Sequence, residues 1–132
     1  MTHLLDTDIC SFHMKKPAGL AHRFFQYAGG LAISSITLAE LYAGAYRLSD
    51  PNKLLSKIDD LLQDVGLVAF DAEAAERYGN VYGTLVKQGR TPPVIDTMNA
   101  SLALLHNLTL VTHNTQDYQH VPELRLEDWL IP

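Results

Sequence analysis

This sequence alternates short apolar runs with longer segments of helical periodicity, and this alternation constrains the fold more than any other feature. Strands and helices that alternate along a chain favour βα units, in which the strands of one sheet run parallel. We expect strands at residues 3–5, 31–34, 67–70 and 109–112, with an edge strand near 124–126. The expected helices cover about residues 8–15, 19–27, 37–48, 51–65, 72–88 and 96–106. The predicted fold is therefore α/β, with a mostly parallel sheet of four or five strands.

Four acidic residues follow the expected strands or stand where a helix opens: Asp6, Glu40, Asp96 and Asp117. The carboxyl ends of parallel strands line one crevice, so these distant side chains are expected to meet there. Carboxylates that meet repel each other, and a fold tolerates them best when a hard cation such as Mg²⁺ neutralises them. The pattern predicts a metal-dependent enzyme that acts on phosphate.

Each of the four acids also has a plainer interpretation as a helix cap. Residues 37–40 match a capping box that ends in Glu40, and residues 114–117 are similar. Asp6 and Asp96 each stand where a side chain can cap the following helix. The joint pattern favours the metal site, because Asp6 follows a strand expected to be central and buried. An unpaired charge there would be costly.

Polar neighbours support the same site. Thr112 and Asn114 end the fourth expected strand, where they can hold a water or orient Asp117. Asp8 either faces the same crevice or caps a helix, and the capping role is favoured slightly. His113 is a candidate general acid because histidine is a common proton donor in enzymes, although a plain loop histidine is the more common case. No zinc-ligand spacing is present, so zinc is not expected.

Composition describes one ordinary globular domain spanning residues 1–132. No apolar run approaches the roughly 20 residues that cross a membrane. No basic stretch precedes an apolar leader, and the only cysteine, Cys10, has no internal partner. A cytoplasmic location is therefore expected. The net charge of −5 is unusual for a nucleic-acid binder. One bound Mg²⁺ would make it −3, and lysines and arginines remain for a local basic patch.

Four segments together resemble a PIN-domain ribonuclease, most closely the VapC toxins of bacterial toxin–antitoxin pairs. They are Leu4-Leu5-Asp6-Thr7-Asp8-Ile9, Ser34-Ser35-Ile36-Thr37-Leu38-Ala39-Glu40-Leu41, Gln88-Gly89-Arg90 ahead of Asp96, and Leu110-Val111-Thr112-His113-Asn114-Thr115-Gln116-Asp117-Tyr118. The resemblance extends to the ending Leu124-Arg125-Leu126-Glu127-Asp128-Trp129. Any one segment is weak evidence, whereas their order and spacing are specific.

This resemblance implies a three-layer α/β/α sandwich and Mg²⁺-dependent cleavage of RNA phosphodiester bonds by an activated water, with Mn²⁺ able to substitute. It places Asp6, Glu40 and Asp96 on the family's three core acidic positions and Asp117 on a more variable fourth. It also implies a VapB-type antitoxin that covers the active site, a homodimer, and a tRNA substrate. The subgroup with this Asn-Thr-x-acid-aromatic segment includes enzymes that cut initiator tRNA in the anticodon loop. The helix at 37–48, with Tyr42 and Tyr46, is a candidate antitoxin contact.

Three positions depart from the family pattern. Asp8 stands where relatives more often carry Asn, which adds negative charge near the acids. Pro92-Pro93-Val94-Ile95 replaces a glycine-containing approach to the third acid, and Asn114 stands where many wider PIN domains carry Asp. All four acids are nevertheless present.

Two other functions compete with the ribonuclease. A phosphatase of the haloacid dehalogenase class would use Asp6-Thr7-Asp8 as its nucleophile and acid pair. That class also expects a paired acid at a strand end, whereas Asp59-Asp60 lies in a helical pattern. The second alternative is a binding module that keeps the fold without the chemistry. Loss of a core acid would have favoured it.

Overall fold

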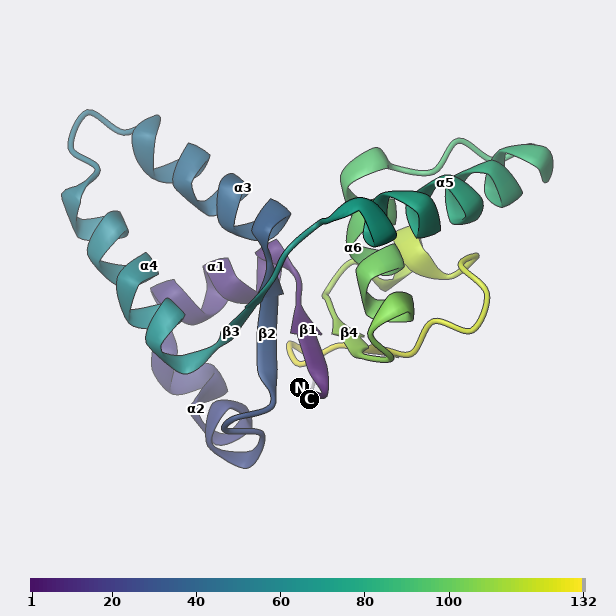
Figure 1. The fold of residues 1–132 in the computed structure, drawn as a ribbon. Coiled ribbons are helices and arrows are strands. Elements are labelled where there is room, and N and C mark those ends of the chain that lie inside the picture. Colours follow the sequence, from purple (N-terminus) through teal and green to yellow (C-terminus); the bar gives the residue numbers. More distant parts are fainter. Residues whose placement is uncertain (132) are drawn as a thin grey trace.

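The computed structural model describes residues 1–131 and has three layers, with helices on both faces of a central sheet (Figure 1). The sheet has five strands, all parallel, in the order β3-β2-β1-β4-β5. The strands are β1 (His3–Leu5), β2 (Leu31–Ser34), β3 (Gly66–Val68), β4 (Thr109–Val111) and β5 (Leu126–Glu127). The helices are α1 (Thr7–Lys15), α2 (Pro17–Gln26), α3 (Ser35–Tyr46), α4 (Asn52–Asp64), α5 (Ala72–Lys87) and α6 (Val94–Leu105), with a short 3₁₀ helix, η1 (Thr115–Tyr118). The predicted α/β sandwich is confirmed.

The central strand β1 is buried along its whole length, as the sequence predicts. Leu4 pairs with Ala32 of β2 on one side and with Leu110 of β4 on the other. Strands covered on both faces are largely apolar, and β1 and β2 show this pattern apart from His3 and Ser34 at their ends. Asp6 therefore leaves the sheet at its centre, between the ends of β2 and β4.

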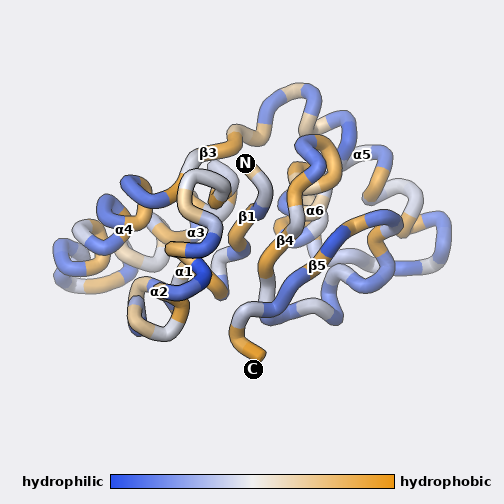
Figure 2. Tube along the Cα trace, turned by 90° about the horizontal axis from the view of Figure 1, so that it is seen from below, coloured by the Kyte–Doolittle hydropathy of each residue, from blue (hydrophilic) through white to orange (hydrophobic). Residues whose placement is uncertain are grey.

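Two apolar clusters fill the spaces above and below the sheet. Successive residues of a strand point to opposite faces, so Leu5 joins one cluster and Leu4 the other. Helices α1 to α4 pack on one side of the sheet and α5 and α6 on the other (Figures 1 and 2). Within residues 1–131, no helix is both long and apolar enough to cross a membrane.

The C-terminal segment closes one edge of the sheet. β5 begins two residues later than expected and pairs with β4 through Leu126 and Glu127. Trp129 packs against the body of the domain, because its side chain is buried and its ring stacks on Tyr27 with centroids 5.8 Å apart.

Several helices begin earlier or later than the sequence predicts. β2 runs directly into α3, so Ser34 is the N-cap and its Oγ accepts a hydrogen bond from the Thr37 backbone N–H. The capping-box interpretation of residues 37–40 is therefore wrong. Helix α6 begins at Val94 with Pro93 in the cap position, so Asp96 is not its cap. Similarly, α4 begins at Asn52, one residue after the expected start.

Candidate active site

Asp6 lies at the centre of the carboxyl edge of the sheet and is only 6 % exposed. It caps α1, because its Oδ1 accepts a hydrogen bond from the Thr7 backbone N–H at 2.8 Å. Its Oδ2 accepts bonds from the Tyr118 hydroxyl at 2.7 Å and from the Thr112 hydroxyl at 3.0 Å. Asp6 therefore caps α1 and is at the same time a member of the acidic cluster. Its donors fix the orientation of a buried charge.

A buried polar network lies on the other side of Asp6. The Asn99 amide donates to Asp6 Oδ1 at 3.5 Å and to Thr37 Oγ1 at 3.4 Å. The Ser34 hydroxyl in turn donates to Asn99 Oδ1 at 2.6 Å. Asn99, Ser34 and Thr37 are all buried, so the network links the ends of β1 and β2 to α6 through satisfied polar groups.

Asp96, on the first turn of α6, is the second acid of the centre. Burial raises the pKa of its carboxyl to about 6, with further increases from the charges of Asp6, Asp117 and Glu40. An interaction with the Tyr118 hydroxyl opposes this shift. The four predicted acids are therefore close enough for their charges to interact. Such a cluster of like charges attracts cations.

Tyr118 joins the two central acids. Its hydroxyl donates to Asp6 and also interacts with Asp96, and the side chain is only 1 % exposed. Burial, together with the neighbouring carboxylates, raises the pKa of this phenol. The hydroxyl therefore stays protonated and remains a donor near neutral pH.

Glu40 and Asp117 lie on either side of this centre, and both are exposed. Glu40 Oε1 accepts a 2.6 Å hydrogen bond from the Thr7 hydroxyl, which ties α3 to α1. It lines a cavity of about 510 Å³, whereas Asp117, on η1, lines a separate one of about 400 Å³. A ligand that crosses the central acids thus finds an open cavity on each side.

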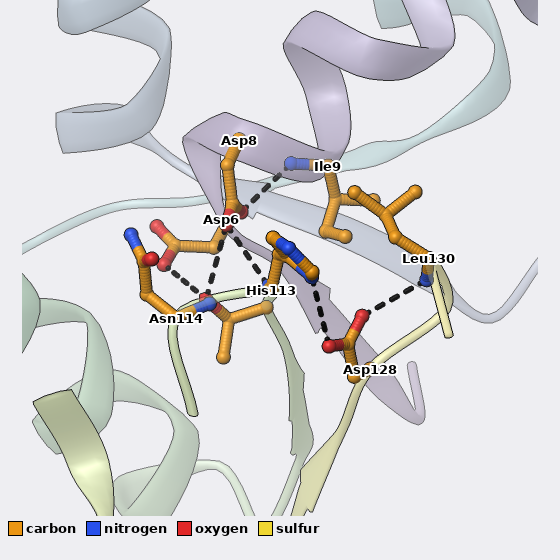
Figure 3. A network of polar contacts seen from close by, with 8 residues as sticks. Asp6, Asp8, Ile9, His113, Asn114, Asp128 and Leu130 are labelled. Atoms are coloured by element: carbon orange, nitrogen blue, oxygen red, sulfur yellow. Dashed lines mark hydrogen bonds and ion pairs between the residues drawn. The ribbon is translucent and has the colours of Figure 1, made fainter. Parts of the chain in front are cut away.

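The loop after β4 holds the other predicted residues (Figure 3). Thr112 contacts Asp6 rather than Asp117, and its Oγ1 accepts a bond from the Asn114 backbone N–H at 3.1 Å. Asp8 Oδ2 accepts the His113 backbone N–H at 2.9 Å, while its Oδ1 accepts that of Ile9. The His113 ring pairs with Asp128 at 2.9 Å. Asp8 therefore clamps α1 to the loop.

The acids suit a hard divalent cation by their chemistry. Carboxylate oxygens are the preferred ligands of Mg²⁺, which keeps several waters and needs few protein ligands. In residues 1–131, however, no three Asp, Glu, His or Cys side chains are already arranged as a metal-binding group. The oxygens of Asp6 and Glu40 instead face hydroxyl donors. Binding would require these carboxylates to turn toward the ion.

Sequence reasoning missed Asn99 and Tyr118. Asn99 follows Asp96 by three residues and so lies on the same face of α6. It is also a large polar residue directly between Met98 and Ala100, and this contrast could have identified it. Tyr118 carried no such signal, because nothing local distinguishes a packed aromatic ring from a buried hydroxyl donor.

The sequence of this chain matches one protein family and several known relatives. A family model described as PIN domain matches residues 4–124. The tRNA(fMet)-specific endonuclease VapC of Shigella flexneri is 39 % identical over 127 residues, which cover 96 % of each chain. Ribonuclease VapC2 of Haemophilus influenzae is 34 % identical over 131 residues, covering 98 % of this chain and 99 % of the relative.

Solved structures agree with these sequence matches. The chain superposes on VapBC2 from Rickettsia felis, bound to a promoter DNA fragment, with a TM-score of 0.90 and 32 % identity. That match covers 98 % of this chain and 99 % of the other. DNA-bound VapBC from Salmonella typhimurium gives a TM-score of 0.92 and 31 % identity, covering 98 % of both chains.

Proposed function

This chain belongs to the PIN-domain family, and from that membership we propose that it is a metal-dependent endoribonuclease, the toxin of a VapBC-type toxin–antitoxin pair. The observation that carries the proposal is the place of Asp6 at the carboxyl edge of the sheet, close enough to Asp96 for its charge to raise the pKa of that carboxyl. Relatives that share nearly the whole chain are ribonucleases by name.

Asp6 and Asp96 would hold the ion, which we take to be Mg²⁺ with Mn²⁺ as a substitute. Glu40 and Asp117 would complete the acidic site from either side. A divalent cation at this place lowers the pKa of water and stabilises charge on a phosphate oxygen. The chain's own contribution is to fix Asp6 through Thr112, Tyr118 and Asn99. These hydrogen bonds keep the Asp6 carboxylate at the carboxyl edge of the sheet, from where it would turn toward the ion.

The substrate we propose is tRNA, and specifically initiator tRNA cut in its anticodon loop. The support is the Shigella relative, whose name specifies tRNA(fMet). The partner is a VapB-type antitoxin, supported by the VapBC complexes that this fold matches. We further propose that the antitoxin covers the acids, that the chain forms a homodimer, and that it acts in the cytoplasm, where tRNA is found.

The competing phosphatase has no support in the contacts. That reaction needs Asp8 as a free acid, whereas Asp8 accepts two backbone N–H groups. The pair Asp59-Asp60 is exposed on α4 and not at a strand end. The alternative to the ribonuclease is a non-catalytic binding module, and a tRNA cleavage assay distinguishes the two functions.

The test is incubation of purified protein with total tRNA in millimolar Mg²⁺ and in EDTA, beside the Asp96→Asn variant. Discrete fragments that need Mg²⁺ and are absent from the variant reaction are the expected result. Mapped ends in the initiator tRNA anticodon loop would support the finer proposal. Intact tRNA under all conditions, with the protein folded, would favour the binding module.

A further inference from the structure

We propose that the cavity between α1, α3 and α4 is an RNA-backbone subsite, in which Lys15, Arg47 and Lys57 hold phosphates that flank the cleaved bond. This inference rests on the proposed ribonuclease function. The cavity, here called the α1–α3–α4 pocket, has a volume of about 510 Å³. Thr7 and Glu40 line it at the acidic site, and the three cations line it elsewhere.

Helix geometry sets the spacing between the acids and the cations. Both α1 and α3 follow strands of the parallel sheet, so both begin at its carboxyl edge and run away from it. Thr7 and Lys15 are eight residues apart on α1, and Glu40 and Arg47 are seven apart on and just after α3. At 1.5 Å per residue, each cation lies about 10–12 Å along its helix from the acidic edge. Both cations line the same cavity as Thr7 and Glu40, a short length of RNA away from them.

The three cations are available to a ligand. The ion pairs among residues 1–131 both involve histidine, His3 with Glu127 and His113 with Asp128, so none of the three cations is paired with a carboxylate. Lys15 and Arg47 are exposed, and Lys57 is half-buried. Clustered cations repel one another, so three in one pocket suit an anionic ligand.

RNA fits this pocket better than an acidic protein segment does. A chain of net charge −5 with four clustered carboxylates repels RNA unless cations near the site offset that field. Phosphate contacts supply most of the affinity of non-specific nucleic-acid binding. When one phosphate of an RNA strand reaches the acids, other phosphates of the same RNA strand can reach Lys15 and Arg47. Between these ends, Leu41 and Leu54 give the pocket apolar walls for ribose or base.

The test uses a pair of double variants in the cleavage-deficient Asp96→Asn background. Lys15→Gln/Arg47→Gln removes two pocket cations, and Lys16→Gln/Lys53→Gln is the matched control. Lys16 and Lys53 are exposed lysines close by in sequence that lie outside the pocket. Both double variants carry the same net charge. Binding of an initiator tRNA transcript is measured by fluorescence anisotropy in EDTA at several salt concentrations, with thermal midpoints to verify folding.

The pocket variant should bind about tenfold more weakly than the control near physiological salt. Its salt slope should fall by about 1.4, because each phosphate of a single strand that the protein no longer neutralises lowers the slope by about 0.7. With Asp96 restored, its KM should rise while kcat stays close to that of the control.

Equal affinities and slopes for the two variants would overturn the proposal. Poly-glutamate is measured in the same way as a second anionic probe. If the pocket variant binds tRNA as the control does but loses poly-glutamate binding, the proposal is overturned and the pocket is assigned to an acidic protein segment. Failure of the ribonuclease proposal is distinguishable, because it would appear as absent cleavage by wild type.

Discussion

The hydroxyl of Tyr118 lies 2.7 Å from Oδ2 of Asp6, although 112 residues separate them in the chain. This buried hydroxyl lies beside a second carboxylate, that of Asp96, whose charge also raises the pKa of the phenol. Hydrogen bonds to charged groups contribute about 1.5–3 kcal/mol each. We expect this hydrogen bond to matter most when no cation is bound between the acids.

Replacing Tyr118 with Phe tests that expectation, because the ring is kept and only the hydroxyl is removed. In EDTA the variant should unfold about 5–12 °C below wild type, since a loss of about 1.5–3 kcal/mol shifts the midpoint of a domain this size by roughly 3–4 °C per kcal/mol. The deficit should shrink in millimolar Mg²⁺, because the ion then balances the carboxylates. The matched control is Tyr82→Phe on α5, which should show no dependence on Mg²⁺. An equal deficit with and without Mg²⁺ would show that the hydroxyl acts only in packing.

Replacing Asp96 with Asn separates the charge from the size of the side chain. We expect the variant to fold, to lose cleavage of tRNA, and to lose the thermal stabilisation that Mg²⁺ gives wild type. A ligand that binds only the folded state raises its stability, so the shift reports the site directly. Differential scanning fluorimetry with and without about 5–10 mM MgCl₂, on the order of what saturates a weak carboxylate site, gives the comparison. A variant that retains the full Mg²⁺ shift would remove Asp96 from the ligand set.

The pKa of Asp96 predicts the pH dependence of stability. Burial and neighbouring charges raise this pKa to about 6, above the ordinary value of 3.8. The folded state therefore holds the proton more tightly than the unfolded chain. The stability from this group is fully present below pH 3.8 and is lost as the pH rises through about 6. In EDTA, Asp96→Asn should thus be more stable than wild type near neutral pH, and this advantage should shrink as the solution is acidified. A difference that is constant with pH would contradict the assignment.

The same titration predicts the pH dependence of cleavage. A protonated Asp96 does not ligate a cation, so tRNA cleavage at fixed Mg²⁺ should fall as the pH drops below about 6. Added Mg²⁺ should partly restore the rate, because metal and proton compete for one carboxylate. Initial rates on both sides of this pKa, at two Mg²⁺ concentrations, test this. If added Mg²⁺ does not shift the pH dependence of the cleavage rate, a group other than Asp96 is titrating.

Asp8 offers a contrasting prediction, because it accepts hydrogen bonds from two backbone N–H groups and from the Thr112 hydroxyl. Asp8→Asn should cost about 1 kcal/mol of unfolding free energy, since an amide oxygen replaces only one of the two acceptors. Cleavage and the Mg²⁺ shift should be retained. A loss of the Mg²⁺ shift as large as that of Asp96→Asn would make Asp8 a metal ligand instead of a clamp.

The sequence predicted the parallel sheet and the place of Asp6 at its carboxyl edge, because both follow from local periodicity and the geometry of parallel strands. Asp6 shows this clearly, since its place after a short buried strand fixes its position at the central crevice. Errors arose at helix starts. The cap of α3 is Ser34 and not Thr37, because β2 joins α3 without a loop. Asn99 and Tyr118 escaped because their contacts to Asp6 span 93 and 112 residues and depend on tertiary packing.

The proposed chemistry depends on a divalent cation held by Asp6 and Asp96, and a crystal grown or soaked in Mn²⁺ would show whether it binds there. An anomalous difference map locates Mn²⁺ without reference to the protein coordinates. We predict a peak within carboxylate-ligand distance of both Asp6 and Asp96, with Glu40 or Asp117 beside it or linked through water. A peak elsewhere, or none at Mn²⁺ concentrations that support cleavage, would contradict the assignment of these two acids as metal ligands.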